Sequence, residues 1–514
     1  MKMFKKITSM ALVVVMMFSC ITVISSNIVK AAVNTEEWQN TAIISPTQGK
    51  LIGAGYIDVK WNNNLDNVKQ YKVYVDGVLK KTVAPSGETM VCEFYTTAVK
   101  SHTAQVVAEL YNQTTLKSNV TTFYVTKKGV CVNENDMGTA VDPMDMNIGW
   151  YYNWGYQSFK DRGFKNKKFY ETEFVPMTWG DSAVDIPTRC AHANRKGYKY
   201  LLSYNEPDLQ GEANKQPSTM ILRWRETITN KGNLRLGSPA TETFQINSDK
   251  WWTPFWNGMS TNDKNNMTFI AVHAYQHYYN NADTALQYLH AIDEIYAKYH
   301  KPIWITEFAV ADLGNTFSPN NSKHLAQVQE FMKIVLKGLN ERNYVERYAW
   351  FNFNPTDSKT GASGIFNYDT GKLTTLGQIY ANIGNPAGYK AKTYGVSYTT
   401  TKNTSIASCA ASVTTTTYSP IGKKKSIRYS FRTIKRATQY QVQCSLSKKF
   451  NKKKKYRTKT KTFKAKNKSV MSGTFTKLKA KKRYYVRVRA IKNLNGKKYY
   501  CKWSSPKSAK TKKK

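Results

Sequence analysis

The chain has 514 residues, of which 41% are hydrophobic and 13% aromatic, and its formal net charge is +43. Because a single core rarely serves more than about 250–300 residues, several domains are expected. The apolar content is sufficient for real hydrophobic cores, which excludes a chain without folded domains.

The first thirty-one residues have the three parts of a secretory signal peptide. Three lysines within the first six residues precede an uncharged apolar stretch over residues 10–24, and Val29 and Ala31 are small residues at positions that a signal peptidase reads. We therefore predict a signal peptide over residues 1–31, a secreted, extracellular protein and no membrane segment after cleavage. An uncleaved membrane anchor is the alternative, although the apolar stretch is short for a bilayer span of about 20 residues.

Residues 34–126 are predicted to form an all-β module. Residues 71–75 alternate as a strand does, and Asp76-Gly77 is a strong two-residue hairpin turn. Further strand patterns follow at intervals of about ten residues, which is typical of a β-sandwich. The segment resembles the immunoglobulin-like or fibronectin type III-like modules that are attached to many secreted bacterial enzymes.

Residues 141–385 differ in character, because apolar strands alternate with amphipathic helices. Repeated βα units predict a (β/α)8 TIM barrel or a doubly wound sheet, and no Gly-rich phosphate loop follows the first strand, which disfavours a nucleotide-binding sheet. Seven strands are identified and the eighth is not. The strands are predicted at residues 146–152, 173–177, 199–204, 234–239, 268–275, 302–308 and 347–353.

Residues 386–420 are predicted as a linker and residues 421–514 as a second all-β module, with a hairpin turn at Asn495-Gly496. Residues 422–514 hold 35 Lys and Arg and no Asp or Glu. The segment resembles the lysine-rich fibronectin type III modules of bacterial surface proteins. Its charge points to a polyanionic partner, either an anionic cell-wall polymer or an acidic polysaccharide, whereas export argues against nucleic acid. A solvated spacer is the alternative.

The cysteines and histidines predict no metal or cofactor site. Six cysteines remain after the signal peptide, with no CxxC pair and no histidine at zinc-like spacing. Cys444 and Cys501 could form a disulfide within the last module, or all six could be free thiols. We therefore expect no cofactor and no metal.

Two glutamates each end an apolar strand of the predicted barrel. Glu206 lies between Asn205 and Pro207, and this proline cannot continue the strand, while Glu307 ends the stretch Trp304-Ile305-Thr306. Catalytic groups of a barrel lie at the C-terminal ends of its strands, and cleavage of a glycosidic bond requires two carboxyl groups. The alternative for either residue alone is a helix cap or an ion pair.

The ordered motifs of residues 145–382 resemble glycoside hydrolase family 128, a family of β-1,3-glucanases. The resemblance implies that Glu206 is the acid/base, on the fourth strand of a retaining barrel, and Glu307 the nucleophile, on the seventh. The seven identified strands place Glu206 one strand too early for this pattern, so either a short strand escapes the count or the barrel is incomplete. The matching stretches lie at residues 149–154, 174–180, 204–209, 236–240, 269–275 and 348–351.

Several residues at predicted strand ends are candidates for substrate contact. The side chains of His273 and Tyr275 could orient the nucleophile or touch the sugar, and the alternative for His273 is a packed barrel histidine. Tryptophans at strand ends could stack on sugar faces or pack in the core, with Trp350 the preferred candidate and Trp304 assigned to the core. Asp208 could bind sugar or cap its loop. The complete predicted substrate-binding set is Asn153, Trp154, Trp179, Asn205, Asp208, His273, Tyr275 and Trp350.

The sequence therefore predicts a multidomain secreted enzyme, associated with the cell wall through its basic module, with a central (β/α)8 TIM barrel between two all-β sandwich modules. We expect a monomer that acts as a retaining endo-β-1,3-glucanase on a β-glucan substrate. The alternative is a non-catalytic carbohydrate-binding or adhesion protein of the cell surface.

Overall fold

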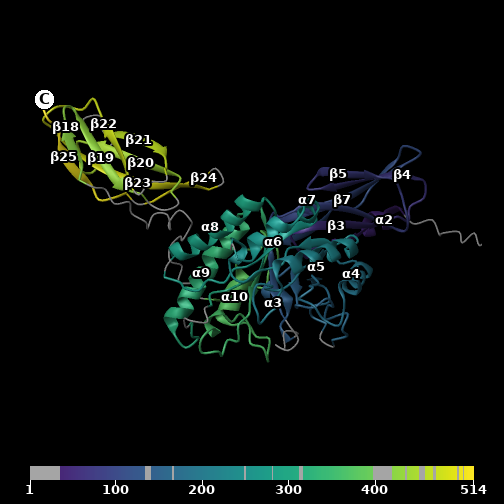
Figure 1. The fold of residues 1–514 in the computed structure, drawn as a ribbon. Coiled ribbons are helices and arrows are strands. Elements are labelled where there is room, and N and C mark those ends of the chain that lie inside the picture. The colour runs from purple at the N-terminus through teal and green to yellow at the C-terminus, as the bar shows by residue number, and fades with distance from the viewer. Residues whose placement is uncertain are drawn as a thin grey trace, which may run out of the picture. The chain divides into compact units, whose positions relative to one another are not determined.

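The computed structural model describes residues 35–132, 140–164, 167–247, 250–280, 282–311, 317–396, 419–433, 437–450, 458–466, 470–494, 497–501 and 503–513 (Figure 1). The predicted signal peptide, most of the predicted linker and the Asn495-Gly496 turn lie outside these residues. None of the helices in the described part of the chain has both the length and the apolar character that a membrane span requires.

The chain divides into two compact units. The first comprises Met1–Lys50, Tyr56–Thr96 and Ser101–Tyr124, and the second comprises Leu51–Gly55, Thr97–Lys100 and Val125–Lys514. The second unit contains both the predicted barrel and the predicted basic module.

The N-terminal unit contains a short helix and antiparallel strands in two sheets. One sheet holds β1, β3 and β6, and the other runs β9-β7-β4-β5 with β8 beside β7. Asp76 and Gly77 both have positive φ (53° and 73°), which a primed hairpin turn requires, so the predicted turn between β4 and β5 is confirmed. The elements are α2 (Thr35–Thr41), β1 (Ile43–Ser45), β3 (Gly55–Asn62), β4 (Val68–Val75), β5 (Val78–Val83), β6 (Thr89–Thr96), β7 (Ser101–Leu110), β8 (Thr115–Lys117) and β9 (Thr121–Thr126).

Buried aromatic rings join these two sheets. Trp61 of β3 contacts Tyr71 of β4 with ring centroids 5.5 Å apart, and Phe94 of β6 contacts Phe123 of β9 at 6.2 Å. The strands alternate buried and more exposed residues, as expected of sheets with one face toward a core. Assignment of this unit to the immunoglobulin or fibronectin families stays a prediction.

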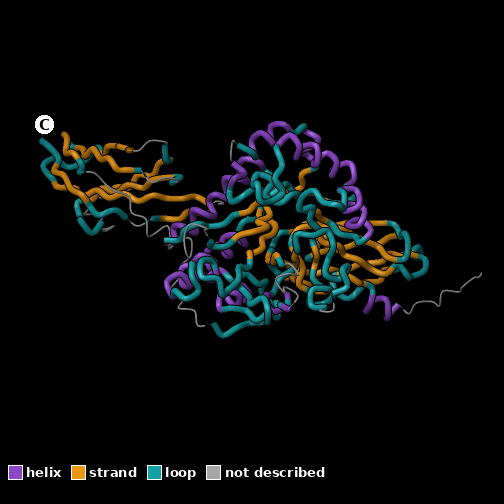
Figure 2. The backbone as a smooth tube through the Cα atoms, turned by 60° about the horizontal axis from the view of Figure 1, so that its bottom comes forward, coloured by secondary structure: helices purple, strands orange, loops and turns teal. Residues whose placement is uncertain are grey.

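Eight parallel strands form a single sheet in the order β12-β11-β10-β17-β16-β15-β14-β13. A parallel bridge between Met177 and Leu202, which follow β12 and β13, connects the two ends of this order, and the arrangement is consistent with a TIM-like barrel. Figure 2 shows these strands at the centre of the domain with helices outside them. The strands are β10 (Lys128–Cys131), β11 (Trp150–Tyr152), β12 (Glu173–Phe174), β13 (Tyr200–Leu201), β14 (Arg235–Gly237), β15 (Met267–His273), β16 (Ile303–Phe308) and β17 (Val345–Phe351).

The helices of this domain follow the strands in chain order. The long helices α8 and α9 pack on one another, as do α4 with α5 and α5 with α6. One face of α9, which includes Val328, Phe331 and Leu339, is buried, as expected of an amphipathic helix. The helices are α3 (Pro143–Met146), α4 (Ile186–Arg195), α5 (Pro217–Asn230), α6 (Trp252–Gly258), α7 (Thr261–Asn265), α8 (Ala282–Tyr299), α9 (Ser322–Asn340) and α10 (Thr375–Asn382).

Strand β10 is the strand that the sequence did not reveal, and the predicted barrel boundary at residue 141 is therefore too late. Lys128 is the first residue of β10, and Lys127 precedes it. Two consecutive lysines are expected to face solvent, but both are fully buried. The Lys127 amine donates to the carbonyl of Arg342 at 2.7 Å, and the Lys128 amine donates to those of Tyr380 and Ala381 at 3.1 Å.

The carbonyls of Tyr380 and Ala381 lie in the last turn of α10, and Lys127 also donates to the last two carbonyls of α9, those of Leu339 and Asn340, at 3.2 Å. Backbone acceptors at the C-terminal end of a helix lack partners within it. The lysine pair therefore caps two helices instead of facing water. Burial lowers the pKa of both amines to about 7.

With β10 included, β13 is the fourth strand of the barrel and β16 the seventh. The barrel is filled at the N-terminal ends of its strands by the guanidinium of Arg347, which lies 5.5, 4.6 and 4.5 Å from the ring centroids of Trp150, Tyr200 and Trp304. Trp150 is fully buried there, so of the two possibilities for the tryptophans, a sugar contact or core packing, this one packs in the core. The core assignment of Trp304 is confirmed.

The C-terminal module also contains two antiparallel sheets. One holds β18, β19 and β22, and the other runs β21-β20-β23-β24 with β25 beside β23. Phe431 of β19 contacts Tyr440 of β20 at 4.9 Å between ring centroids, and Cys444 and Cys501 are free thiols. The fibronectin assignment stays a prediction. The strands are β18 (Ile421–Lys423), β19 (Ser426–Arg432), β20 (Gln439–Ser445), β21 (Lys459–Lys464), β22 (Val470–Phe475), β23 (Arg483–Leu494), β24 (Lys497–Tyr500) and β25 (Lys507–Lys510).

Candidate active site

Glu206 lies just beyond the C-terminal end of the fourth barrel strand. Beyond β13, Asn205 forms a parallel bridge with Ala240. The backbone amide of Glu206 donates to the Ala240 carbonyl at 2.7 Å. Glu206 has φ of 37°, a left-handed conformation that non-glycine residues rarely adopt and that is concentrated at functional sites. The backbone therefore fixes the direction of this carboxylate.

Glu307 lies in β16, the seventh barrel strand, and is buried. Its carboxylate accepts hydrogen bonds from the Tyr275 hydroxyl at 2.7 Å, the Trp154 indole at 3.0 Å and the Tyr152 hydroxyl at 3.1 Å. Burial and then the charge of Glu307 raise the pKa of both tyrosines well above the usual value, so both remain protonated donors. Three donors aimed at one carboxylate stabilise its ionised form.

His273 lies between the two glutamates. It is the last residue of β15 and is paired in register with Glu307. Its Nδ1 lies 2.7 Å from Glu206 Oε1, and its Nε2 lies 3.5 Å from Glu307 Oε1. Burial lowers the pKa of His273, but the charges of Glu307 and Glu206 outweigh burial and raise the pKa above its ordinary value.

The two glutamates therefore approach each other closely. One oxygen of Glu206, one nitrogen of His273 and one oxygen of Glu307 all lie within 4.8 Å of one another. Such a group could also hold a metal ion, although the Glu307 oxygens already accept three hydrogen bonds from protein donors. Two carboxyl groups at this separation, bridged by an imidazole, can perform paired nucleophilic and acid–base chemistry.

Three further carboxyl groups surround Glu206. Asp208 accepts a hydrogen bond from the Glu242 amide at 3.0 Å, which favours the loop-capping interpretation of Asp208. Glu212 accepts one from the Asn205 side-chain amide at 3.0 Å, while the Asn205 Oδ1 is buried without a hydrogen-bond partner among the described residues. Burial, followed by neighbouring negative charge, raises the pKa of Asp208, Glu212 and Glu242.

The predicted aromatic contacts divide into two groups. Trp154 reaches Glu307, and Trp179 is 37% exposed, with its backbone carbonyl accepting a hydrogen bond from the Asn205 amide. Trp350, in contrast, is fully buried, packs on Phe308 and donates to the Ser363 carbonyl at 2.8 Å. Its ring cannot reach a sugar, so the prediction that it lines the substrate rim is wrong.

Asn153 shapes the loop that carries Trp154. Its side-chain amide donates to the Gln157 carbonyl at 3.0 Å, and its oxygen accepts from the Gly155 amide at 3.1 Å. Both polar atoms are thus occupied by the loop itself, and Trp154 has φ of 57° within it. Asn153 thereby supports the position of the indole.

Three aromatic residues of the site were absent from the predicted set. Tyr152 donates to Glu307, and Phe351 packs against Trp154 and Tyr275 with ring centroids 5.9 and 5.8 Å apart. Phe353 contacts Tyr275 at 6.1 Å. Tyr152 ends β11, and Phe351 ends β17. Their position at the ends of strands was the signal that could have revealed them.

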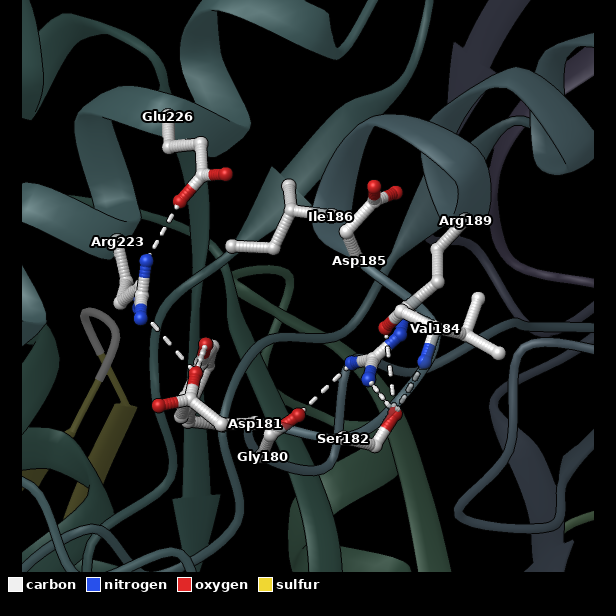
Figure 3. Close-up of a pocket in the computed structure, with 10 residues that line it drawn as sticks. Gly180, Asp181, Ser182, Val184, Asp185, Ile186, Arg189, Arg223 and Glu226 are labelled. Carbon is white, nitrogen blue, oxygen red and sulfur yellow. Dashed lines mark hydrogen bonds and ion pairs between the residues drawn. The ribbon is translucent and has the colours of Figure 1, made fainter.

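A separate pocket of about 160 Å³ lies beside the loop that follows Trp179 (Figure 3). Arg223 links Asp181, at 3.2 Å, to Glu226, at 3.0 Å, and the Tyr204 hydroxyl donates to Asp181 at 2.6 Å. Of the other charged residues that line the pocket, Asp185 accepts a hydrogen bond from the Thr188 amide, and Arg189 donates to the Gly180 carbonyl. Asp181 anchors Tyr204, which lies two residues before Glu206.

Comparison with known proteins is consistent with this geometry. Residues 129–380 match the family model described as the glycosyl hydrolase catalytic core. Alkali-sensitive linkage protein 1 of Schizosaccharomyces pombe is 26% identical over 261 residues, which are 49% of this chain and 44% of that protein. This chain thus matches less than half the length of that relative.

Solved structures similar to this chain include a family 128 subgroup I endo-β-1,3-glucanase from Amycolatopsis mediterranei. It is 28% identical over 50% of this chain and 98% of that chain, with a TM-score of 0.40. A family 128 subgroup III curdlan-specific exo-β-1,3-glucanase from Blastomyces gilchristii is 26% identical over 50% and 98% of the two chains, with a TM-score of 0.37. The matched family model covers just under half of the chain, and the match supports a glycoside hydrolase catalytic core in the barrel.

Proposed function

We propose that this protein is a secreted, retaining glycoside hydrolase that cleaves β-1,3-glucan, with Glu307 as the nucleophile and Glu206 as the acid/base. The observation that carries the proposal is the approach of the two carboxyl groups, whose nearest oxygens lie within 4.8 Å across His273. Retaining enzymes hold their carboxyl groups about 5–5.5 Å apart, whereas inverting enzymes need about 6.5–9.5 Å to admit a water.

The roles follow from the surroundings of each carboxyl group. Glu307, whose carboxylate is oriented by three hydrogen bonds, attacks the anomeric carbon, while Glu206 protonates the departing oxygen. Glu206 then takes a proton from water, which attacks the glycosyl-enzyme and releases the sugar with its configuration retained. The imidazole of His273 contacts both carboxyl groups and maintains their relative positions during the two steps.

The β-1,3 linkage is supported by the sequence resemblance to glycoside hydrolase family 128. Secretion is supported by the predicted signal peptide, which lies outside the described residues. Endo action is the mode that the resemblance favours.

The reaction is tested with purified full-length protein and laminarin, a soluble β-1,3-glucan. New reducing ends should appear, and proton NMR should show that the first product carries the β-anomeric configuration. Cellulose oligosaccharides and a mixed-linkage glucan serve as comparisons. An initial α-anomer would overturn the retaining mechanism, and failure of the folded protein to cleave any of these glucans would favour the non-catalytic binding protein.

Trp179 supports a separate prediction about substrate binding. Because its exposed ring lies beside the Asn205 segment, Trp179→Ala should raise KM for laminarin about tenfold, while kcat changes less than about threefold. Initial rates across laminarin concentrations measure both constants. Tyr111→Ala removes a 72% exposed ring from the N-terminal unit and should change neither constant. An unchanged KM for Trp179→Ala would remove this ring from the substrate path.

A further inference from the structure

The outer face of one sheet in the C-terminal module carries two arginines side by side. Along β23, Tyr484, Val486 and Val488 are buried, whereas Arg487 and Arg489 project from the opposite face and are half-buried. Alternate residues of a strand lie about 6.7 Å apart, so the two guanidinium groups are close neighbours. We call Arg487 and Arg489 the arginine pair.

Aromatic rings hold each member of the arginine pair in place. The Arg487 guanidinium lies 4.2 Å from the Phe450 centroid and 4.3 Å from that of Trp503. The Arg489 guanidinium lies 4.5 Å from the Trp503 centroid and 4.1 Å from that of Tyr500. Trp503 is thus shared by both cations, and the stacking fixes side chains that would otherwise be mobile.

Neutral oxygens are the only protein acceptors that the structure shows for these two side chains within the described residues. Arg487 donates from Nε and Nη2 to Gln443 Oε1, and Arg489 donates from the same two atoms to Gln441 Oε1, at 2.7–3.0 Å. The glutamine amides in turn donate to Thr460 and Thr462 at 3.2–3.3 Å. Each guanidinium has five N–H donors, so these bonds occupy fewer than half of them.

No carboxylate of this module can neutralise the arginine pair, since residues 422–514 contain no Asp or Glu. Partly buried cations are normally paired with an anion, because burial without a counter-charge is costly. Partial burial and then the charge of Arg489 lower the pKa of Arg487, which reflects the absence of a nearby counter-charge. The arrangement is a preorganised cationic site without an anion from its own module.

We propose that the arginine pair binds adjacent phosphates of a linear phosphodiester polymer of polyols, since the predicted export of the protein argues against nucleic acid. A guanidinium forms two parallel hydrogen bonds with a phosphate, and its planar fork favours this geometry over that of a lysine. A phosphodiester chain carries one full charge at each repeat, so neighbouring phosphates can occupy neighbouring guanidinium groups. The many lysines of the module add long-range attraction that depends on salt, while the arginine pair supplies the fixed contacts.

Binding of poly(glycerol phosphate) to the full-length protein tests this proposal by calorimetry at two salt concentrations. Arg487→Gln/Arg489→Gln should weaken binding by about tenfold or more, whereas Lys424→Gln/Lys481→Gln, which removes the same charge from exposed lysines, should weaken it less than about threefold. Arg487→Lys/Arg489→Lys keeps the charge but loses the fork and should resemble the glutamine pair. An unchanged circular dichroism spectrum and cooperative thermal unfolding show that each variant is folded.

Two outcomes would overturn the proposal. Equal losses for the arginine and lysine variants would show that the module binds by diffuse charge alone. Tighter binding of polygalacturonate or duplex DNA than of poly(glycerol phosphate) would exclude a phosphodiester polymer of polyols as the preferred partner. Neither result depends on the barrel's activity, so the two proposals fail separately.

Discussion

Glu307→Gln should lower kcat/KM on laminarin by on the order of 10⁴-fold or more, which is the largest effect expected of any single change in this chain. The amide is nearly the same size as the carboxylate but cannot attack the anomeric carbon. It also places an NH₂ group among the donors Tyr275, Tyr152 and Trp154, which now lack one acceptor. Initial rates of reducing-end formation measure the loss.

A carboxylate far from the site provides the matched control. Glu294 on α8 has a side chain that is 55% exposed, so Glu294→Gln removes one negative charge without touching the barrel mouth. Its rate should equal that of the unmodified protein. A Glu307→Gln protein that retained more than about one-hundredth of the activity would exclude Glu307 as the nucleophile.

Azide separates the roles of the two glutamates. With an activated aryl β-glucoside, departure of the aryl group needs no acid, so Glu206→Ala should still form the glycosyl-enzyme, and azide should then release a β-glycosyl azide. Glu307→Ala should instead allow direct attack and give the α-glycosyl azide. The opposite pattern of products would exchange the two assignments.

The sequence singled out the two candidate glutamates because each has a local pattern, whereas it did not reveal strand β10 of the barrel around them. Pro207 ends a strand directly after Glu206, and Glu307 closes an apolar run. The contacts between them were not predictable in this way. His273 contacts Glu206, which lies 67 residues earlier in the chain. The separation of the two glutamates depends on the register of β15 against β16 and on the unusual φ of Glu206.

Two errors have a common physical cause, since burial depends on partners distant in sequence. Lys127 and Lys128 appear hydrophilic, and their burial depends on acceptors distant in sequence, which are carbonyls in and just beyond α9, carbonyls of α10 and the Asn385 side chain. Trp350 lies one residue before Phe351, the last residue of β17, and the alternation of strand side chains points Trp350 away from the mouth and against Phe308. Neither outcome can be read from composition or periodicity.

Arg347→Met should lower the free energy of unfolding of the barrel domain by about 3–5 kcal/mol, the range observed when one partner of a buried ion pair is removed. Arg347 is fully buried, donates to both oxygens of Glu173 at 2.9 and 3.0 Å and to the Ala54 carbonyl at 2.8 Å, and stacks on three rings. Methionine fills much of the volume but leaves these acceptors without their donor.

The loss corresponds to a fall of roughly 10 °C in the melting temperature of a domain of this size, which scanning calorimetry measures. The comparison is Arg225→Met. Arg225 donates from Nε and Nη2 to one oxygen of Asp263 and is 48% exposed. The Asp263 side chain is buried but keeps a hydrogen bond from the Ser260 amide, so a smaller loss of about 1–2 kcal/mol is expected. If Arg347→Met unfolds at the same temperature as the unmodified protein, the buried cation contributes no net stability, and the packing of rings such as Trp150 and Trp304 holds the N-terminal end of the barrel.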